Sequence, residues 1–440
     1  MGSESYKNIR MIGYAIPTTP ENVISIGNPN GPGAVAGDYL GDSDIQKDVQ
    51  ARISIMKSAV DTAKSKIPIN EIGVINLFVI PEFYFHGLSG PYIYSEESSD
   101  PIIFIREALE NTFNSVDYPD WMFVCGSVIS AQVKDQVEMF ESESVRSRNN
   151  IVRTLSEEWK ESFGPLKGVI FDMLINFIKV CHSYPNCEVR NRSVIINNMG
   201  ISSPQTGEIT NLMTTEKYYV SNEDFLLYDT KNSQRVITEQ MTAYPAIDLS
   251  SGDSKQTAFD QYAIFRQGIN IVEAAAMDYG IEICLDHIDM RLRRNISNEP
   301  APIVSPHIQI IPSCGMQIIP SSVATDRSGI VFNCDGQYTL NDNEIGEGKI
   351  DGVDSVYANY AQGSYGAHSQ LARVKTPALG SNPNRDESHD AIFEPLGSEL
   401  VHSISVENPP KNIGDYYAGG AGQIHIYGLE SPLLLYPGSS

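Results

Sequence analysis

The first residue that could do chemistry is Glu82, which stands directly after an apolar run and before an aromatic cluster. A carboxylate at the carboxyl end of a covered strand lies where open α/β sheets bind ligands. Aromatic neighbours would desolvate this carboxylate and make it a stronger base. A glutamate at such a position, taken alone, more often points into water. Tyr84 and Phe85 follow closely and could line a pocket or simply pack at the edge of the sheet, whereas His86 could contact a substrate or be a loop histidine.

Lys217 and Cys284 are the other two candidates for chemistry. Lys217 lies between polar and aromatic residues in the segment TTEKYY, where a solvated lysine at a sheet edge is the ordinary occurrence. Cys284 ends the short apolar run GIEIC, and a cysteine there is commonly a small buried hydrophobe. A thiol at a strand-to-turn transition can nevertheless face a pocket with free backbone N–H groups beside it. Those donors would favour the thiolate, so Cys284 could act as a nucleophile.

Strand and helix patterns alternate along the chain, and these elements must position the three candidates. Ser43 and Gln46 form an S-x-x-Q capping box ahead of apolar residues spaced three and four apart. This spacing predicts an amphipathic helix that ends before Pro68. A Gly/Pro-rich loop precedes the helix, and a second helix is expected over 101–113. Strands are expected at 7–16, 72–80, 121–130, 193–198, 216–220, 281–286, 308–313, 329–334, 400–406 and 423–427, with further helices at 166–182 and 268–279.

This alternation predicts an α/β fold. The nearly continuous apolar run at 72–80 is typical of a strand that is covered on both faces. A chain of 440 residues could form one large domain or two to three ordinary ones. Because no clean linker interrupts it, we expect a single domain over 1–440 with surface insertions near 131–164, 226–260 and 340–390. The last of these is rich in Gly, Asn, Asp and Ser, and we expect long loops there.

Composition excludes several classes of function. The net charge of −24 argues against nucleic acid or an anionic membrane as a partner, because both require clustered Lys and Arg. No run of about 18 apolar residues is present, so no membrane span is expected. The start MGSESYKNIR lacks a signal-peptide core, and we expect a cytoplasmic protein. The six cysteines form no C-x-x-C pair, and the spacing of Asp286, His287 and Asp289 does not suit a metal site. We therefore expect neither a metal nor a cofactor.

Taken together, the three segments resemble the nitrilase (carbon–nitrogen hydrolase) superfamily. Its members carry Glu in a strand-end P-E motif, Lys in a strand after a turn, and Cys in a strand-end I-C-x-D motif. Here Pro81-Glu82, Lys217 and the run ICLD around Cys284 occur in the same order. The run VCGS between Glu82 and Lys217 and the run IIPSCG after Cys284 also match the family pattern. The resemblance covers roughly residues 7–335 and, more weakly, 400–427.

The chain also departs from the family pattern. The interval from Glu82 to Lys217 is long, and Thr-Glu stands where the family usually has a tyrosine-arginine lead-in to the lysine. Many members have a second Glu after the Lys. Glu223, Asp224 or Glu239 could fill that role, and Glu223 is preferred.

The resemblance implies a four-layer α-β-β-α sandwich that assembles into a homodimer or a larger homo-oligomer. It implies hydrolysis of a small amide or nitrile, in which Cys284 attacks, Glu82 acts as base, and Lys217 and the backbone N–H of Leu285 stabilise the negative charge. Asp286 would orient the cysteine loop, and His287 is a candidate substrate contact.

Amide hydrolysis is the first choice of reaction. Nitrile hydrolysis, N-carbamoyl cleavage and acyl transfer to an amine are close alternatives in chemistry. From another class, the chain could be a non-catalytic binding or scaffold protein on the same fold. The three segments could also be coincidental in an unrelated α/β protein.

Overall fold

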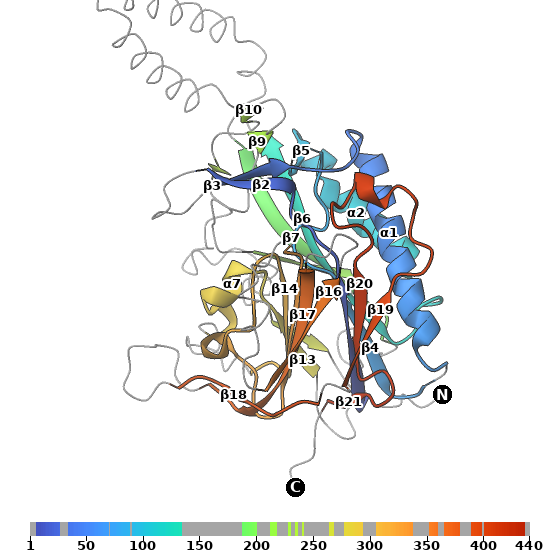
Figure 1. Ribbon diagram of the computed structural model, residues 1–440, viewed down its shortest axis with the longest axis vertical. Coiled ribbons are helices and arrows are strands. Elements are labelled where there is room, and N and C mark those ends of the chain that lie inside the picture. Colours follow the sequence, from blue (N-terminus) through green and yellow to red (C-terminus); the bar gives the residue numbers. More distant parts are fainter. Residues whose placement is uncertain are drawn as a thin grey trace, which may run out of the picture.

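Two β-sheets pack face to face in the computed structural model, and two long helices cover the outer face of the first sheet (Figure 1). The structure describes residues 6–26, 34–69, 71–88, 90–133, 187–199, 212–217, 228–229, 234–235, 240–241, 264–267, 277–293, 305–337, 352–359, 365–378, 389–397 and 400–435.

The first sheet has the strand order β11-β7-β6-β4-β1-β20-β19, and β5, β8 and β21 pair alongside this path. Its strands are β1 (Asn8–Ala15), β4 (Val74–Val79), β5 (Tyr92–Tyr94), β6 (Trp121–Val133), β7 (Cys187–Asn197), β8 (Leu212–Glu216), β11 (Gln240–Met241), β19 (Val401–Ser405), β20 (Gln423–Tyr427) and β21 (Leu433–Leu434). β1, β4 and β6 are parallel, whereas β7 is antiparallel to both β6 and β8. β8 therefore runs in the same direction as β4, and their carboxyl ends lie toward the same edge of the sheet.

The second sheet has the order β12-β13-β14-β15-β17-β16, and β18 pairs with β17. Its strands are β12 (Ile264–Gln267), β13 (Met277–Ile281), β14 (Ile308–Ser313), β15 (Ile330–Asp335), β16 (Val353–Asn359), β17 (Tyr365–Thr376) and β18 (Ile392–Phe393). β13, β14 and β15 are parallel neighbours, so their carboxyl ends also meet at one edge. Two separate ribbons are formed by β2 (Glu21–Ile26) with β3 (Ala34–Asp38) and by β9 (Tyr228–Asp229) with β10 (Gln234–Arg235).

The long helices α1 (Ile45–Lys66) and α2 (Pro101–Thr112) lie side by side (Figure 1). Asp44 caps α1, because its carboxylate accepts hydrogen bonds from the backbone N–H groups of Gln46 and Lys47 at 3.0 and 3.3 Å. The capping box predicted at Ser43 is therefore wrong by one residue, although the helix ends before Pro68 as expected. The short α7 (Leu285–Ile288) follows β13, and the 3₁₀ turns of the described residues span Glu97–Ser99, Pro320–Ser322 and Ile413–Asp415.

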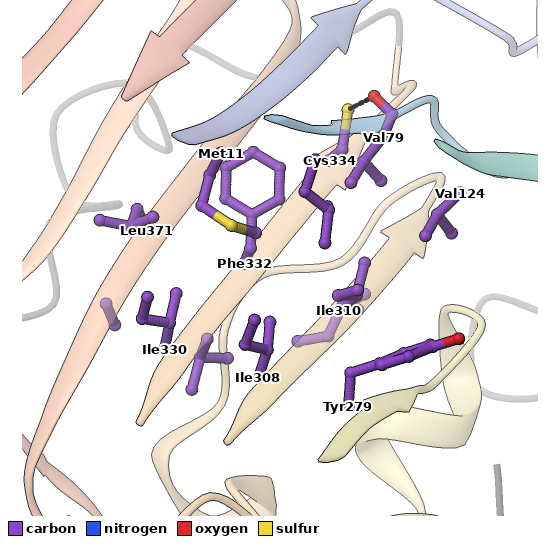
Figure 2. Packing of buried hydrophobic residues seen from close by; sticks show 14 of the residues in the cluster. Met11, Val79, Val124, Tyr279, Ile308, Ile310, Ile330, Phe332, Cys334 and Leu371 are labelled. Carbon is purple, nitrogen blue, oxygen red and sulfur yellow. Dashed lines mark hydrogen bonds between the residues drawn. The ribbon is translucent and has the colours of Figure 1, made fainter. Parts of the chain in front are cut away.

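Each face of the first sheet has its own apolar core. Leu77 and Val79 of β4 point to the second sheet, whereas Phe78 and Ile80 point to the helices. This strand is buried on both faces, as its continuous apolar run predicts. Figure 2 shows the core between the sheets, where the Cys334 thiol donates to the carbonyl oxygen of Val79 at 3.4 Å. The two sheets thus pack closely beside the strand that leads to Glu82.

Several sequence predictions are confirmed in position and others are wrong. The strands at 308–313 and 423–427 have the predicted bounds. The expectation of loops over 340–390 is wrong, because β16 and the 12-residue β17 lie there. Residues 277–279, expected to be helical, begin β13 instead. β8 ends at Glu216, so Lys217 follows its strand rather than lying within it.

Buried polar residues explain the missed strand β17. His368, Ser369 and Gln370 are almost fully buried within it, and their polarity made the segment resemble a loop. The predicted helix at 166–182 lies outside the described residues, as do most of the expected insertions at 131–164 and 226–260. The described layers are one of helices and two of strands, and the four-layer sandwich stays a prediction. None of the helices in the described part of the chain is long and apolar enough to cross a membrane.

Candidate active site

Glu82 lies just beyond the carboxyl end of β4 with its side chain completely buried. Its backbone N–H donates to the carbonyl oxygen of Ser313 at 3.2 Å, and the Thr18 hydroxyl donates to its carbonyl oxygen at 2.6 Å. Gly126 of β6 lets the chain pass here, because a Cβ at this position would stand 1.9 Å from the carbonyl oxygen of Pro81. The backbone on both sides of the carboxylate is therefore fixed by close contacts.

A buried ion pair joins Glu82 to Lys217, although the two residues are 135 positions apart. The Lys217 Nζ lies 3.0 Å from Glu82 Oε1, and neither side chain is more than 1% exposed. The Asn191 Nδ2 donates to the same oxygen at 2.8 Å. Within the described residues, Glu82 Oε2 has no hydrogen-bond partner. One carboxylate oxygen is thus held by two donors while the other keeps its lone pairs available for a proton.

Cys284 lies in the turn between β13 and α7, and its backbone is strained. Its φ of +49° and ψ of −107° are unusual for a residue with a Cβ, and such strain concentrates at functional sites. The residue is 5% exposed and belongs to the apolar core between the sheets. Its carbonyl oxygen accepts from the backbone N–H of His287 at 2.8 Å, and its Sγ lies 4.0 Å from the carbonyl oxygen of Cys314.

Two consecutive residues at the end of β14 connect Cys284 to Glu82. The backbone N–H of Cys284 donates to the carbonyl oxygen of Pro312 at 3.1 Å, and that of Glu82 donates to the carbonyl oxygen of Ser313. The candidate nucleophile and the candidate base come from different sheets, and this strand end brings their backbones to adjacent residues.

Arg291 connects the cysteine loop to the lysine segment. Its Nη1 donates to Asp286 Oδ2 at 2.8 Å and to the carbonyl oxygen of Glu216 at 2.7 Å. Asp286 is fully buried and stands two residues after Cys284, while Glu216 directly precedes Lys217. The contact fixes the position of Asp286 in the cysteine loop, and its role in orienting that loop stays a prediction. Glu82 and Lys217 thus form a direct ion pair, and Cys284 is connected to them through the end of β14 and through Arg291.

Asp335 shapes the segment that follows β14. Its Oδ2 accepts from the Ser313 hydroxyl at 2.6 Å and from the backbone N–H groups of Gly315 and Met316, both at 2.7 Å. The partly exposed Cys314 lies inside this turn. Burial raises the pKa of its thiol, and the carboxylates of Asp335 and Glu82 raise it further. Cys314 is therefore a second thiol beside the Glu82–Lys217 pair, and its environment keeps it protonated.

His287 has partners inside the protein at both ring nitrogens. Its Nε2 accepts from the backbone N–H of Ile319 at 3.0 Å, so its Nδ1 carries the proton that it shares with Glu282 Oε2 at 2.6 Å. The Gln309 amide also donates to Glu282 Oε2 at 2.6 Å. This buried network holds α7 against the second sheet. We assign His287 to the support of the cysteine turn rather than to substrate contact.

Tyr84, Phe85 and His86 lie on the other side of the first sheet, among the residues that face the helices. The Tyr84 hydroxyl donates to the carbonyl oxygen of Arg52 at 2.9 Å, and the Arg52 guanidinium donates back to the carbonyl oxygen of Tyr84 at 3.2 Å. Burial and the Arg52 charge lower the pKa of His86 well below its usual value. The structure does not bring these three candidate substrate contacts to Cys284, and they anchor the segment after Glu82 instead.

The remaining candidates stand as follows. Glu223 and its alternatives Asp224 and Glu239 lie outside the described residues. Leu285 is the first residue of α7, so its N–H belongs to the first-turn donors that the helix itself does not satisfy. In the part of the chain that the structure describes, no three His, Cys, Asp or Glu side chains gather as metal ligands would.

Comparison with known proteins gives no relative: no family model, no curated protein and no solved structure matches this chain. Sequence reasoning did not assign Asn191, Cys314, Arg291 or Asp335 to the site. Each of them belongs to it only through contacts that join segments far apart in the chain.

Proposed function

We propose that this chain is a hydrolase of non-peptide carbon–nitrogen bonds in the nitrilase superfamily, acting as an amidase through a thioester on Cys284. The observation that carries the proposal is the buried ion pair of Glu82 and Lys217. Backbone hydrogen bonds to the end of β14 connect this pair to the strained turn at Cys284. A buried ion pair is expensive to maintain, and its position beside a thiol gives it a chemical use. The four-layer sandwich and the homo-oligomer belong to the same proposal.

The first half of the reaction forms the thioester. Glu82 takes the thiol proton of Cys284 at Oε2, and the sulfur attacks the carbonyl carbon of the amide. The carbonyl oxygen becomes negatively charged, and the Lys217 ammonium and the Leu285 N–H stabilise it. Glu82 then passes its proton to the nitrogen, the carbon–nitrogen bond breaks, and ammonia or an amine leaves.

The second half of the reaction releases the acid. Glu82 accepts a proton from a water molecule, and the resulting hydroxide attacks the thioester carbon. The carbon–sulfur bond breaks, and Glu82 returns the proton to the Cys284 sulfur. One amide and one water thus give one carboxylic acid and one amine, and the enzyme returns to its starting state. Lys217 stays protonated throughout, since the negative charges beside it favour its charged form.

The test offers the protein a panel of small amides, nitriles and N-carbamoyl compounds and measures ammonia release. The reaction is also stopped during turnover so that the thioester is preserved. The protein is then digested, and the mass of each cysteine-containing peptide shows which thiol carries the acyl group. We expect ammonia release from at least one amide, an acyl adduct on Cys284, and no turnover by Cys284→Ala. The buried Cys125 of β6 belongs to the helix-facing core, so Cys125→Ala is the matched control and should retain turnover.

Other results would change the assignment in defined ways. Release from nitriles alone would make the protein a nitrilase, and acyl transfer to an added amine would make it a transferase. An adduct on Cys314 would move the nucleophile to the neighbouring thiol. Unchanged hydrolysis by Cys284→Ala would refute the mechanism. No hydrolysis or adduct with any compound of the panel would favour a non-catalytic binding protein.

A further inference from the structure

The side chain of Asn191 contacts Glu82, and the proposed reaction gives it no role. It lies within β7, opposite Ile129 of β6, and is 3% exposed. Its Nδ2 lies 2.8 Å from Glu82 Oε1. A carboxylate can only accept hydrogen bonds, so the amide must turn its NH₂ group toward Glu82. The carboxamide is thus buried in direct contact with the candidate base.

Asn191 also holds the other partner of the ion pair. Its carbonyl oxygen accepts from the backbone N–H of Lys217 at 2.9 Å. The same residue therefore fixes the carboxylate through its side chain and the start of the lysine segment through its backbone. The backbone bond continues the pairing of β7 with β8 and would form with any side chain, so the contact to Glu82 is the one that requires asparagine.

The two donors on Glu82 meet at a single oxygen. Lys217 Nζ and Asn191 Nδ2 both approach Oε1, at 3.0 and 2.8 Å, and Oε2 has no partner among the described residues. With one donor alone the carboxylate could turn and exchange its two oxygens. With two donors converging on one oxygen, such a turn would break two charge-assisted hydrogen bonds, which are among the strongest in proteins.

We propose that Asn191 is a positioning residue for the proposed hydrolysis, which fixes Glu82 so that Oε2 is the atom that takes and returns the proton. This inference rests on the proposed function of Glu82 as base. Asn191 acts through Glu82 and contacts neither the sulfur nor the acyl group.

The test compares Asn191→Leu, which has a similar volume but no donor, with a matched control just beyond the same strand. Asn198 stands one residue past the end of β7, is 7% exposed, and donates through Nδ2 to the carbonyl oxygen of Phe113 at 2.7 Å. Asn198→Leu therefore removes a similar buried hydrogen bond away from Glu82. We expect Asn191→Leu to lower kcat about 10- to 100-fold with KM changed less than about twofold, the range expected from one hydrogen bond to a charged group. Asn198→Leu should change kcat less than about twofold at a comparable loss of thermal stability.

A second variant separates positioning from packing. Asn191→Asp keeps the shape of the side chain but replaces the donor with a second carboxylate facing Glu82. We expect it to lose at least as much kcat as Asn191→Leu near neutral pH. Full activity of Asn191→Asp would mean that shape alone matters and would overturn the proposal, as would a loss confined to KM in Asn191→Leu.

A substrate-independent measurement separates this inference from the function it rests on. Iodoacetamide alkylates thiolates, and peptide masses report the rate at Cys284 alone. We expect Asn191→Leu to slow this alkylation about 10-fold or more and Asn198→Leu to leave it unchanged. If the wild-type protein hydrolyses nothing while alkylation depends on Asn191, the proposed function fails and the positioning stands. If the wild-type protein hydrolyses amides and Asn191→Leu matches its kcat and its alkylation rate, the positioning fails and the function stands.

Discussion

Replacing Gly126 by alanine tests how the site is built. The added Cβ would lie 1.9 Å from the carbonyl oxygen of Pro81, whereas Cβ contacts below 3.0 Å essentially never occur. Pro81 must therefore move by at least 3.0 − 1.9 = 1.1 Å. It cannot move freely, because two hydrogen bonds fix the following turn to Ser127 of β6. The N–H of Phe83 donates to the Ser127 hydroxyl at 2.9 Å, and the N–H of Phe85 donates to the Ser127 carbonyl oxygen at 3.0 Å.

The displacement falls on Glu82, the residue directly after Pro81. A shift of this size would take the Lys217 Nζ–Glu82 Oε1 distance from 3.0 Å toward about 4 Å, beyond hydrogen-bond reach. Misplacement by about 1 Å can lower a rate about 100-fold. We expect kcat for amide hydrolysis to fall by about that factor in Gly126→Ala, with an overpacking cost of about 1–3 kcal/mol in stability.

The assay is ammonia release under saturating amide, with thermal and urea unfolding of the same preparations. Gly414→Ala is the matched control, because nothing lies within 4 Å of the Cβ that it would add. It should leave both kcat and stability unchanged. If Gly126→Ala retained kcat within about threefold, the position of Glu82 would not depend on the close passage of Pro81 over β6, and the reasoning would be refuted.

Two further predictions concern buried charges. Arg291→Met leaves the buried carboxylate of Asp286 without its cation and removes the donor to the Glu216 carbonyl, so urea unfolding should show a loss of about 3–5 kcal/mol and hydrolysis should slow. Burial, and then the nearby His368, lowers the pKa of His425 to about 3, below the value of about 6.5 for an exposed histidine. The stability that neutral His425 contributes is fully present above about pH 6.5 and is lost as the pH falls toward 3, by up to about 5 kcal/mol. Urea unfolding from pH 7 to 4 should therefore show that the free energy of unfolding declines less steeply in His425→Gln than in the wild-type protein.

Each of these predictions has its own control. The double variant Asp286→Asn with Arg291→Met removes both charges, and it should be more stable than Arg291→Met alone. Equal stability of the two would mean that the ion pair carries no coupling. His389 is exposed, so His389→Gln should keep the full acid dependence of the wild-type protein. A His425→Gln curve parallel to that of the wild-type protein would show that His425 does not titrate on unfolding.

The strands that lead to Glu82 could be predicted from the sequence because their burial is simple. β4 is apolar on both faces, and a continuous apolar run of strand length has few other interpretations. β17 could not be predicted, because it buries His368, Ser369 and Gln370, and Ser369 there contacts His425 of β20, 56 positions further along the chain. Burial of polar side chains depends on partners that only the folded chain supplies. The polarity of a segment is therefore a poor guide wherever a strand crosses a polar part of the core.

The site itself divides in the same way. Glu82 and Cys284 could be selected because each ends an apolar run beside a turn, and Lys217 because of its order after Glu82. Asn191 carried no such signal, since its contact with Glu82 spans 109 positions and depends on the pairing of β6 with β7. The aromatic residues after Glu82 gave a misleading signal, because pocket walls and sheet packing favour the same residue types.

The backbone strain at Cys284 gives the strongest argument that the cluster is more than packing. A buried cysteine in a core needs no unusual conformation, yet Cys284 holds a positive φ that costs of order 1–3 kcal/mol. The Glu282–His287–Gln309 network holds this turn against the second sheet, and the Asp286–Arg291 pair ties it to the end of β8 in the first sheet. A fold that only packed its two sheets would relax the turn and replace these buried charges with apolar residues. Retention of the strain together with the buried Glu82–Lys217 pair favours a site in which the position of the sulfur is the property being stabilised.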